Sequence, residues 1–185
     1  MPRNTFFLLV RVAIIIVLAG ALYWIAMPRQ QAARQQPGPI PPDALHGFQV
    51  FLHHQPCIGG CAAYAVLVKG DSHKIRYAGD KNVATTGSVT AQASDQQLRA
   101  LYRAVVQADF FSIADVYHPG GTGCEAPERG KPQVVIGVTR NKRTKVIHYD
   151  YGCRSAPPAL AELVVEIDQI LNTRRWTAGS APAGR

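Results

Sequence analysis

Apolar and polar residues alternate along several short stretches of the chain, a pattern that is typical of half-buried β-strands. The stretches that alternate in this way are 48–53, 64–68, 74–77, 87–92, 134–138 and 145–149. A Gly-Asp-Ser sequence at 70–72 and a basic segment at 140–143 each separate two of these stretches, and both predict turns. We therefore expect two hairpins in a mostly antiparallel sheet.

Two other segments place apolar residues three and four positions apart, which predicts amphipathic helices. The first begins at Ser94, where Gln97 completes a capping-box signature, and it ends near Asp109. The second follows Ser155 and two prolines suited to a first helical turn. Its apolar positions are Leu160, Leu163, Val164, Ile167, Ile170 and Leu171. The expected order is βββ(β)-α-ββ-α, which describes a single α+β domain of two hairpins and two packed helices over residues 43–176.

The N-terminal part of the chain shows neither the alternation of strands nor the spacing of amphipathic helices. After a tail at residues 1–4, residues 5–27 are apolar except for a few polar side chains, and Arg11 is their only charge. Such a helix spans about 30 Å, the hydrocarbon thickness of a bilayer, so we expect a transmembrane signal anchor before the domain. Cleavage at an Ala-Gly-Ala sequence and a buried core helix are the alternatives, although the apolar run continues past that sequence.

The segments that flank the domain have compositions that do not support packing. Residues 28–42 contain five prolines and four glutamines, which predicts a semi-extended linker. Residues 177–185 are rich in alanine, glycine, serine and proline, and we expect a disordered tail there.

Charge and cysteine content together predict where the domain resides. Arg3, Arg11 and the α-amino group slightly outweigh Arg29 and Arg34, which favours an N-terminus inside the cell. Four cysteines behind an export-type N-terminus favour two disulfides over free thiols. We therefore expect a single-pass protein of the inner (cytoplasmic) membrane with its C-terminal domain extracytoplasmic, in the periplasm.

The basic character of the chain does not indicate a nucleic-acid partner. The net charge is +8, but four of the twenty basic residues precede the domain, which leaves sixteen against twelve acidic residues. Basic residues are not interleaved with aromatic ones, as single-stranded nucleic acid requires. The cations at 140–145 predict a solvated turn or, alternatively, a contact with anionic lipid or envelope polymer.

The cysteines allow three pairings, of which we expect Cys57 with Cys61 and Cys124 with Cys153. Two glycines between the first two cysteines let a short ring close, and the second pair brackets the second hairpin. A redox pair is the alternative for Cys57 and Cys61, although their spacing differs from C-x-x-C and no helix is expected to begin there.

A metal site is a further alternative for the same region. His53, Cys57 and Cys61 have the ligand chemistry that zinc or copper requires. His54 is also near, but neighbouring residues of a strand face opposite sides, so only one of the two histidines can join the cysteines. Another ligand would then come from His118 or His148.

Short motifs spread over the domain form a recognisable combination. They are Pro56-Cys57-Ile58-Gly59-Gly60-Cys61-x-x-Tyr64, Gly70-Asp71, Ala108-Asp109-Phe110-Phe111-Ser112, Asp115-x-Tyr117 and Trp176. In this combination the chain resembles the uncharacterised bacterial domain-of-unknown-function family 6438. The resemblance implies export, because members often follow lipoprotein signals or single transmembrane helices, and it implies no assigned activity.

No Ser-His-Asp or Cys-His arrangement can be derived from this sequence, and nothing in it calls for a cofactor. We expect a non-enzymatic, membrane-anchored extracytoplasmic domain that acts as a binding or assembly module of the cell envelope. Its partner would be an envelope protein or polymer. The alternative is a thiol-disulfide redox or metal-handling protein that uses Cys57 and Cys61.

Overall fold

The computed structural model describes residues 39–121, 124 and 128–178. The expected signal anchor at 5–27 and the tail at 1–4 lie outside these ranges, as do most of the linker at 28–42 and of the tail at 177–185. Within the described ranges, no helix combines the length and the apolar character that a membrane span requires.

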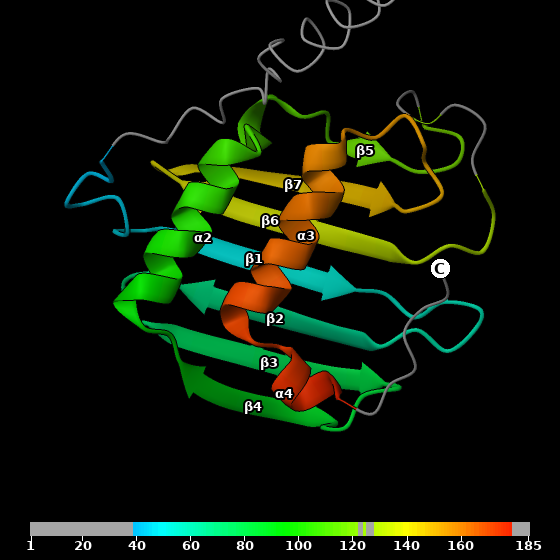
Figure 1. The fold of residues 1–185 in the computed structure, drawn as a ribbon, viewed down its shortest axis with the longest axis horizontal. Coiled ribbons are helices and arrows are strands. Elements are labelled where there is room, and N and C mark those ends of the chain that lie inside the picture. The colour runs from blue at the N-terminus through cyan, green and yellow to red at the C-terminus, as the bar shows by residue number, and fades with distance from the viewer. Residues whose placement is uncertain (1–38, 122–123, 125–127, 179–185) are drawn as a thin grey trace, which may run out of the picture. The chain divides into compact units, whose positions relative to one another are not determined.

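A seven-stranded sheet forms the frame of the described domain, with the strand order β4-β3-β2-β1-β6-β7-β5 (Figure 1). The strands are β1 (Gln49–His54), β2 (Ala63–Lys69), β3 (Lys74–Lys81), β4 (Gly87–Gln92), β5 (Val116–Tyr117), β6 (Gln133–Arg140) and β7 (Arg143–Asp150). Neighbours are antiparallel except β5 and β7, which are parallel. The expected α+β class and mostly antiparallel sheet are therefore confirmed.

The described helices lie on one face of this sheet, which Figure 1 shows in front of the strands. They are α2 (Asp95–Gln107), α3 (Pro158–Leu171) and the short α4 (Arg174–Thr177), and a 3-10 turn at Phe110–Ser112 follows α2. The expected capping box is present, because the Ser94 side chain accepts from Gln97 N and the Gln97 side chain accepts from Ser94 N. Ser155 does not cap α3, which begins after Pro157 without a side-chain cap.

The hydrophobic core fills the space between the helices and the inner face of the sheet. Strand residues that alternate toward the helices are buried, such as Val50 and Leu52 in β1. The apolar stripe of α3 packs onto them, with Leu163 and Ile167 at most 1% exposed. At the other end of the sheet, the Trp176 ring of α4 stacks on Tyr77 with centroids 4.8 Å apart. Burial of this one face leaves the outer face of the sheet free of described helices.

The structure adds features that the periodicity did not predict. The two expected hairpins join into one sheet because β1 pairs with β6, from Gln49 with Thr139 to His54 with Val134. The two-residue strand β5 and the four-residue helix α4 were also not predicted. Both are too short to show a hydrophobic period.

Candidate functional site

Both expected cysteine pairs lie at disulfide distance in the structure. The Cα atoms of Cys57 and Cys61 are 5.3 Å apart, and those of Cys124 and Cys153 are 5.1 Å apart, within the range that a bridge requires. Gly59 and Gly60 have φ angles of 125° and 83°, which favour glycine and turn the β1–β2 connection back on itself. In the described part of the chain, no cysteine is left unpaired.

The residues proposed for a metal site do not come together. The Cys57 and Cys61 sulfurs are bonded to each other, and His53 faces the outer side of the sheet, where its ring lies 6.2 Å from that of Phe51. Two histidines from elsewhere, His118 and His148, line a separate depression of about 350 Å³. Among the described residues, no group of three metal-ligating side chains is present.

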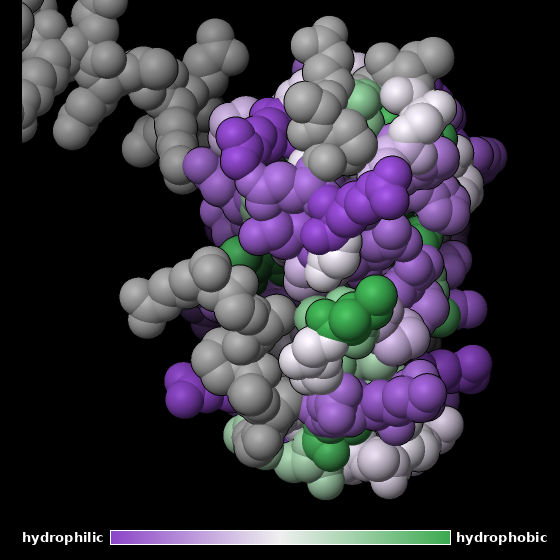
Figure 2. Space-filling model, turned by 90° about the vertical axis from the view of Figure 1, so that its right-hand side faces the viewer, coloured by the Kyte–Doolittle hydropathy of each residue, from purple (hydrophilic) through white to green (hydrophobic). Residues whose placement is uncertain are grey.

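The surface around the β1–β2 connection is mostly hydrophilic. Figure 2 looks onto the end where β1 leads into β2 and shows hydrophobic patches that are small and separated by polar residues. Ile58, between the paired cysteines, is 92% exposed. The visible surface here does not form the extended apolar patch that a large docking interface requires.

Asp168 of α3 is the centre of a hydrogen-bonded network beside the β1–β2 connection. Its Oδ2 lies 2.9 Å from His54 Nε2, and its Oδ1 accepts from Tyr64 OH at 2.6 Å and from Thr173 Oγ1 at 2.8 Å. The His54 and Tyr64 rings stack with centroids 4.6 Å apart. The network therefore ties α3 to the end of β1 and the start of β2.

This network has a His-Asp pair but lacks a group that could attack a substrate. Burial and the neighbouring Asp168 carboxylate raise the pKa of Tyr64 far above its ordinary value, so its hydroxyl stays a neutral donor. The Thr173 hydroxyl is also engaged with Asp168. A catalytic triad needs a nucleophile within reach of the histidine, and none of the described residues in the network supplies one.

The basic segment at 140–145 is largely engaged within the domain. The guanidinium groups of Arg140 and Arg143 lie 5.1 and 5.2 Å from the centre of the Phe111 ring. Lys145 Nζ lies 2.8 Å from Asp115 Oδ1. These contacts hold Arg140, Arg143 and Lys145 against the domain, whereas Lys142 is exposed.

The outer face of the sheet is different, because an apolar row crosses it. Antiparallel register places Leu67 beside Phe51, Phe51 beside Gly137 and Gly137 beside Val146. Phe51 packs over Gly137, where an added Cβ would meet Phe51 Cβ at 3.4 Å. Val146 is 42% exposed. This row is an apolar surface on the face opposite the helices.

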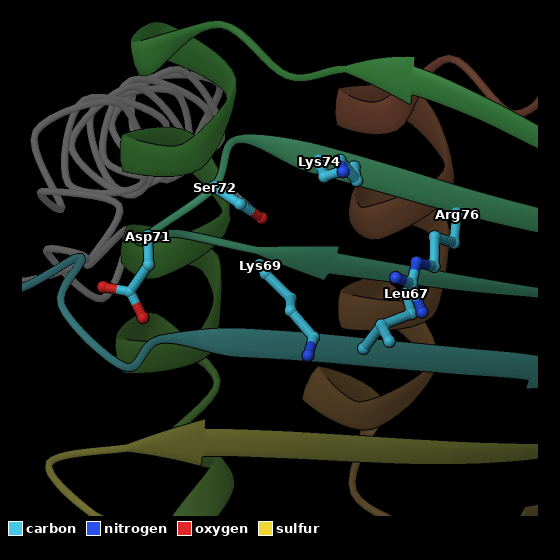
Figure 3. A pocket seen from close by; sticks show the side chains of 6 residues that line it. All are labelled: Leu67, Lys69, Asp71, Ser72, Lys74 and Arg76. Carbon is cyan, nitrogen blue, oxygen red and sulfur yellow. The ribbon is translucent and has the colours of Figure 1, made fainter.

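Three cations continue this surface on β2 and β3. Register places Lys69 opposite Lys74, and Leu67 opposite Arg76. Together with Leu67, Asp71 and Ser72 they line a depression of about 290 Å³, and Figure 3 shows Arg76 beside Leu67 on the outer face. We call Phe51, Leu67, Lys69, Lys74 and Arg76 the open-face cluster.

The cations of the open-face cluster lack neutralising partners in the described chain. Neither Lys69, Lys74 nor Arg76 has an ion pair with a described carboxylate. Asp71 accepts from Gly47 N at 3.0 and 3.1 Å, and in Figure 3 it points away from the cations. Like charges directly opposite on an antiparallel ladder repel each other. An external anion would relieve this repulsion.

The sequence contains a signal for the open-face cluster and for the Asp168 network, although neither was predicted. Lys74 and Arg76 alternate with the buried Ile75 and Tyr77, and the turn at 70–72 brings Lys69 opposite Lys74. Asp168 lies four residues after Val164, on the apolar stripe of α3. A carboxylate on such a stripe indicates a buried polar contact.

Comparison with known proteins identifies the family. The family model described as Domain of unknown function (DUF6438) matches residues 48–171, and the chain belongs to this family. No curated protein matches the chain. The matched region runs from the residue before β1 to the end of α3, so it includes every strand of the sheet, the open-face cluster and the Asp168 network except Thr173.

Proposed function

We propose that this member of the family is a membrane-anchored, extracytoplasmic binding module that captures an acidic protein segment on the outer face of its sheet. The observation that carries the proposal is the open-face cluster, in which three cations without described carboxylate partners border an apolar row. An acidic segment with interspersed apolar residues is complementary to both parts of this surface.

A protein segment fits this surface better than a purely anionic polymer does. The cations alone would attract a polyanion, but a polyanion gains nothing from Phe51 and Leu67, which are half-buried on the outer face. Burial of these side chains by apolar groups of a partner adds a hydrophobic contribution that scales with the area covered. The mixed character of the cluster therefore favours a protein partner.

The anchor and the location are supported by the sequence. Residues 5–27 have the length and composition of a single membrane span, and residues 28–42 have the proline-rich composition of a spacer. Two disulfides agree with a domain outside the cytoplasm, where such bonds persist.

A topology experiment tests the location. Alkaline phosphatase fused after Arg185 should be active, whereas a reporter that works only in the cytoplasm should be silent at the same site. Mass mapping of the four cysteines in the exported protein should find all of them oxidised. Reduced Cys57 and Cys61, with one thiol that alkylates rapidly near neutral pH, would replace this proposal by the redox alternative.

A binding experiment tests the open-face cluster. The probe is a fluorescent peptide of alternating glutamate and valine, titrated with the full chain in neutral detergent. The double variant Lys74→Glu/Arg76→Glu should weaken binding by about tenfold or more, because each reversal replaces an attraction by a repulsion. The single variant Lys74→Glu is compared with the control Lys142→Glu, which makes the same change of charge at the exposed β6–β7 turn.

Two results would contradict the proposal. Equal weakening by Lys142→Glu would show that net charge, and not the open-face cluster, attracts the peptide. Tighter binding of polyphosphate of matched charge, with no loss in a Phe51→Ser variant, would show that the surface serves a polyanion instead.

A further inference from the structure

The edge strand β4 borders the open-face cluster. It runs over six residues from Gly87 to Gln92, and β3 is its only neighbour among the described strands. The opposite edge of the sheet is β5, which has two residues. Figure 1 shows β4 as the last strand at its side of the sheet. The long exposed edge of the described domain is therefore β4.

The alternation of backbone hydrogen bonds along β4 shows which backbone groups face away from the sheet. Ala93 N donates to His73 O at 2.7 Å, so residue 93 bonds toward β3. In an antiparallel ladder the bonding residues alternate, which assigns residues 87, 89 and 91 to β3. The N–H and C=O groups of Ser88, Thr90 and Gln92 consequently point outward, and no described group bonds to them.

This edge lacks the features by which sheets usually prevent strand addition. Edge strands are commonly protected by charged residues, proline or a β-bulge. The sequence of β4 is GSVTAQ, which has neither charge nor proline. Its register with β3 is continuous from Gly79 with Gly87 to Lys74 with Gln92. Within the residues that the structure describes, the edge from Ser88 to Gln92 is thus open to an extended segment.

The cations of the open-face cluster lie within reach of this edge. Arg76 pairs with Thr90 and Lys74 pairs with Gln92, so one strand separates each cation from the edge. A depression of about 540 Å³ is lined by Arg76, Leu67, Ser88 and Thr90 among others, and the short Ser88 and Thr90 side chains leave the space above β4 open. On the other face, partly buried Val89 packs on the core.

We infer that the acidic partner of the open-face cluster adds an extended strand to β4, with carboxylates on the outer face toward Arg76 and Lys74 and apolar side chains beside Val89. This inference rests on the proposed function and specifies how its partner binds. Strand addition satisfies the outward backbone groups of β4, and the alternating side chains provide selectivity. A second copy of this chain that paired through its own β4 would bring a strand without carboxylates, so charge favours a different, acidic chain.

The experiment separates backbone pairing from charge attraction. Thr90→Pro removes the outward N–H of residue 90 without removing a bond to β3, and Thr90→Ala is the matched control that keeps this N–H. The full chain in neutral detergent is titrated with the glutamate-valine peptide and with the same peptide carrying backbone N-methyl groups at alternate residues. Thermal unfolding of each variant confirms that it is folded.

We expect Thr90→Pro to weaken binding of the unmodified peptide by about tenfold and Thr90→Ala to leave it within about twofold. The N-methylated peptide should bind all variants weakly.

If Thr90→Pro unfolds the domain, the N-methylated peptide alone decides, because it tests pairing on the unchanged chain. Equal affinity for both peptides would overturn strand addition while Lys74→Glu/Arg76→Glu still tests the proposed function. If Thr90→Pro lowers the affinity for the peptide but Lys74→Glu/Arg76→Glu does not, the claim that the partner is acidic would be overturned instead. No binding of either peptide to the unchanged chain would overturn the inference.

Discussion

Replacement of Asp168 by alanine tests whether the network under α3 stabilises the domain. The Asp168 carboxylate accepts from Tyr64 and Thr173 through Oδ1 and contacts His54 through Oδ2. These partners come from β1, β2 and the segment after α3, so a single truncation disconnects three parts of the fold.

The magnitude follows from the burial of the groups left behind. Tyr64 is 6% exposed and Thr173 is 3% exposed, and a buried donor without an acceptor costs about 1–3 kcal/mol. The His54 side chain is 18% exposed, so water replaces much of its lost contact. We expect Asp168→Ala to lower the free energy of unfolding by about 3–5 kcal/mol. Asp168→Asn keeps an oxygen for Tyr64 and Thr173 and should cost about 1 kcal/mol.

Urea unfolding of the full chain in neutral detergent measures the effect. Trp176 stacks on Tyr77, and its fluorescence in a Trp24→Phe background reports loss of tertiary packing. Glu166→Ala is the control, because this carboxylate lies on the same helix and has no described hydrogen bond or ion pair. An Asp168→Ala midpoint equal to that of Glu166→Ala would refute the reasoning. Equal costs for Asp168→Ala and Asp168→Asn would show that the charge matters rather than the acceptor.

Three further changes have expected effects on stability. Leu163→Ala should lower the free energy of unfolding by about 2–5 kcal/mol because it leaves a cavity, whereas Val165→Ala, at a side chain 49% exposed, should change it by less than about 0.5 kcal/mol in the same urea assay. Cys124→Ser/Cys153→Ser should cost about 3–4 kcal/mol, because the bridge closes a loop of 29 residues, and an unchanged thermal midpoint would contradict this. The raised pKa of Tyr64 favours its neutral form in the folded state, so Tyr64 should contribute about 1.4 kcal/mol per pH unit to the fall of stability above pH 10.0, to which Tyr77, Tyr149 and Tyr151, whose pKa values are also raised, add. Tyr64→Phe should flatten this fall in unfolding curves measured between pH 9 and 11, and an unchanged slope would show that another group causes it.

Local pattern was sufficient to locate most elements of this domain. The alternation around Val50 and Leu52 predicted β1, and the Ser94 capping box predicted the start of α2. The apolar stripe of α3 and the turn at 70–72 were equally local, because each depends on residues a few positions apart. For the same reason, the cysteine pair within the β1–β2 connection could be proposed from two intervening glycines.

The sequence by itself therefore determined most of the secondary structure, the α+β class and the chemistry available at the cysteines. Only the tertiary structure decided how the two hairpins join, since the pairing of β1 with β6 depends on a contact between residues far apart in the chain. His54 and Asp168 are 114 residues apart, and no local period encodes that they meet. The open-face cluster likewise required knowledge of which sheet face the helices cover, because alternation alone separates two faces without saying which one stays exposed.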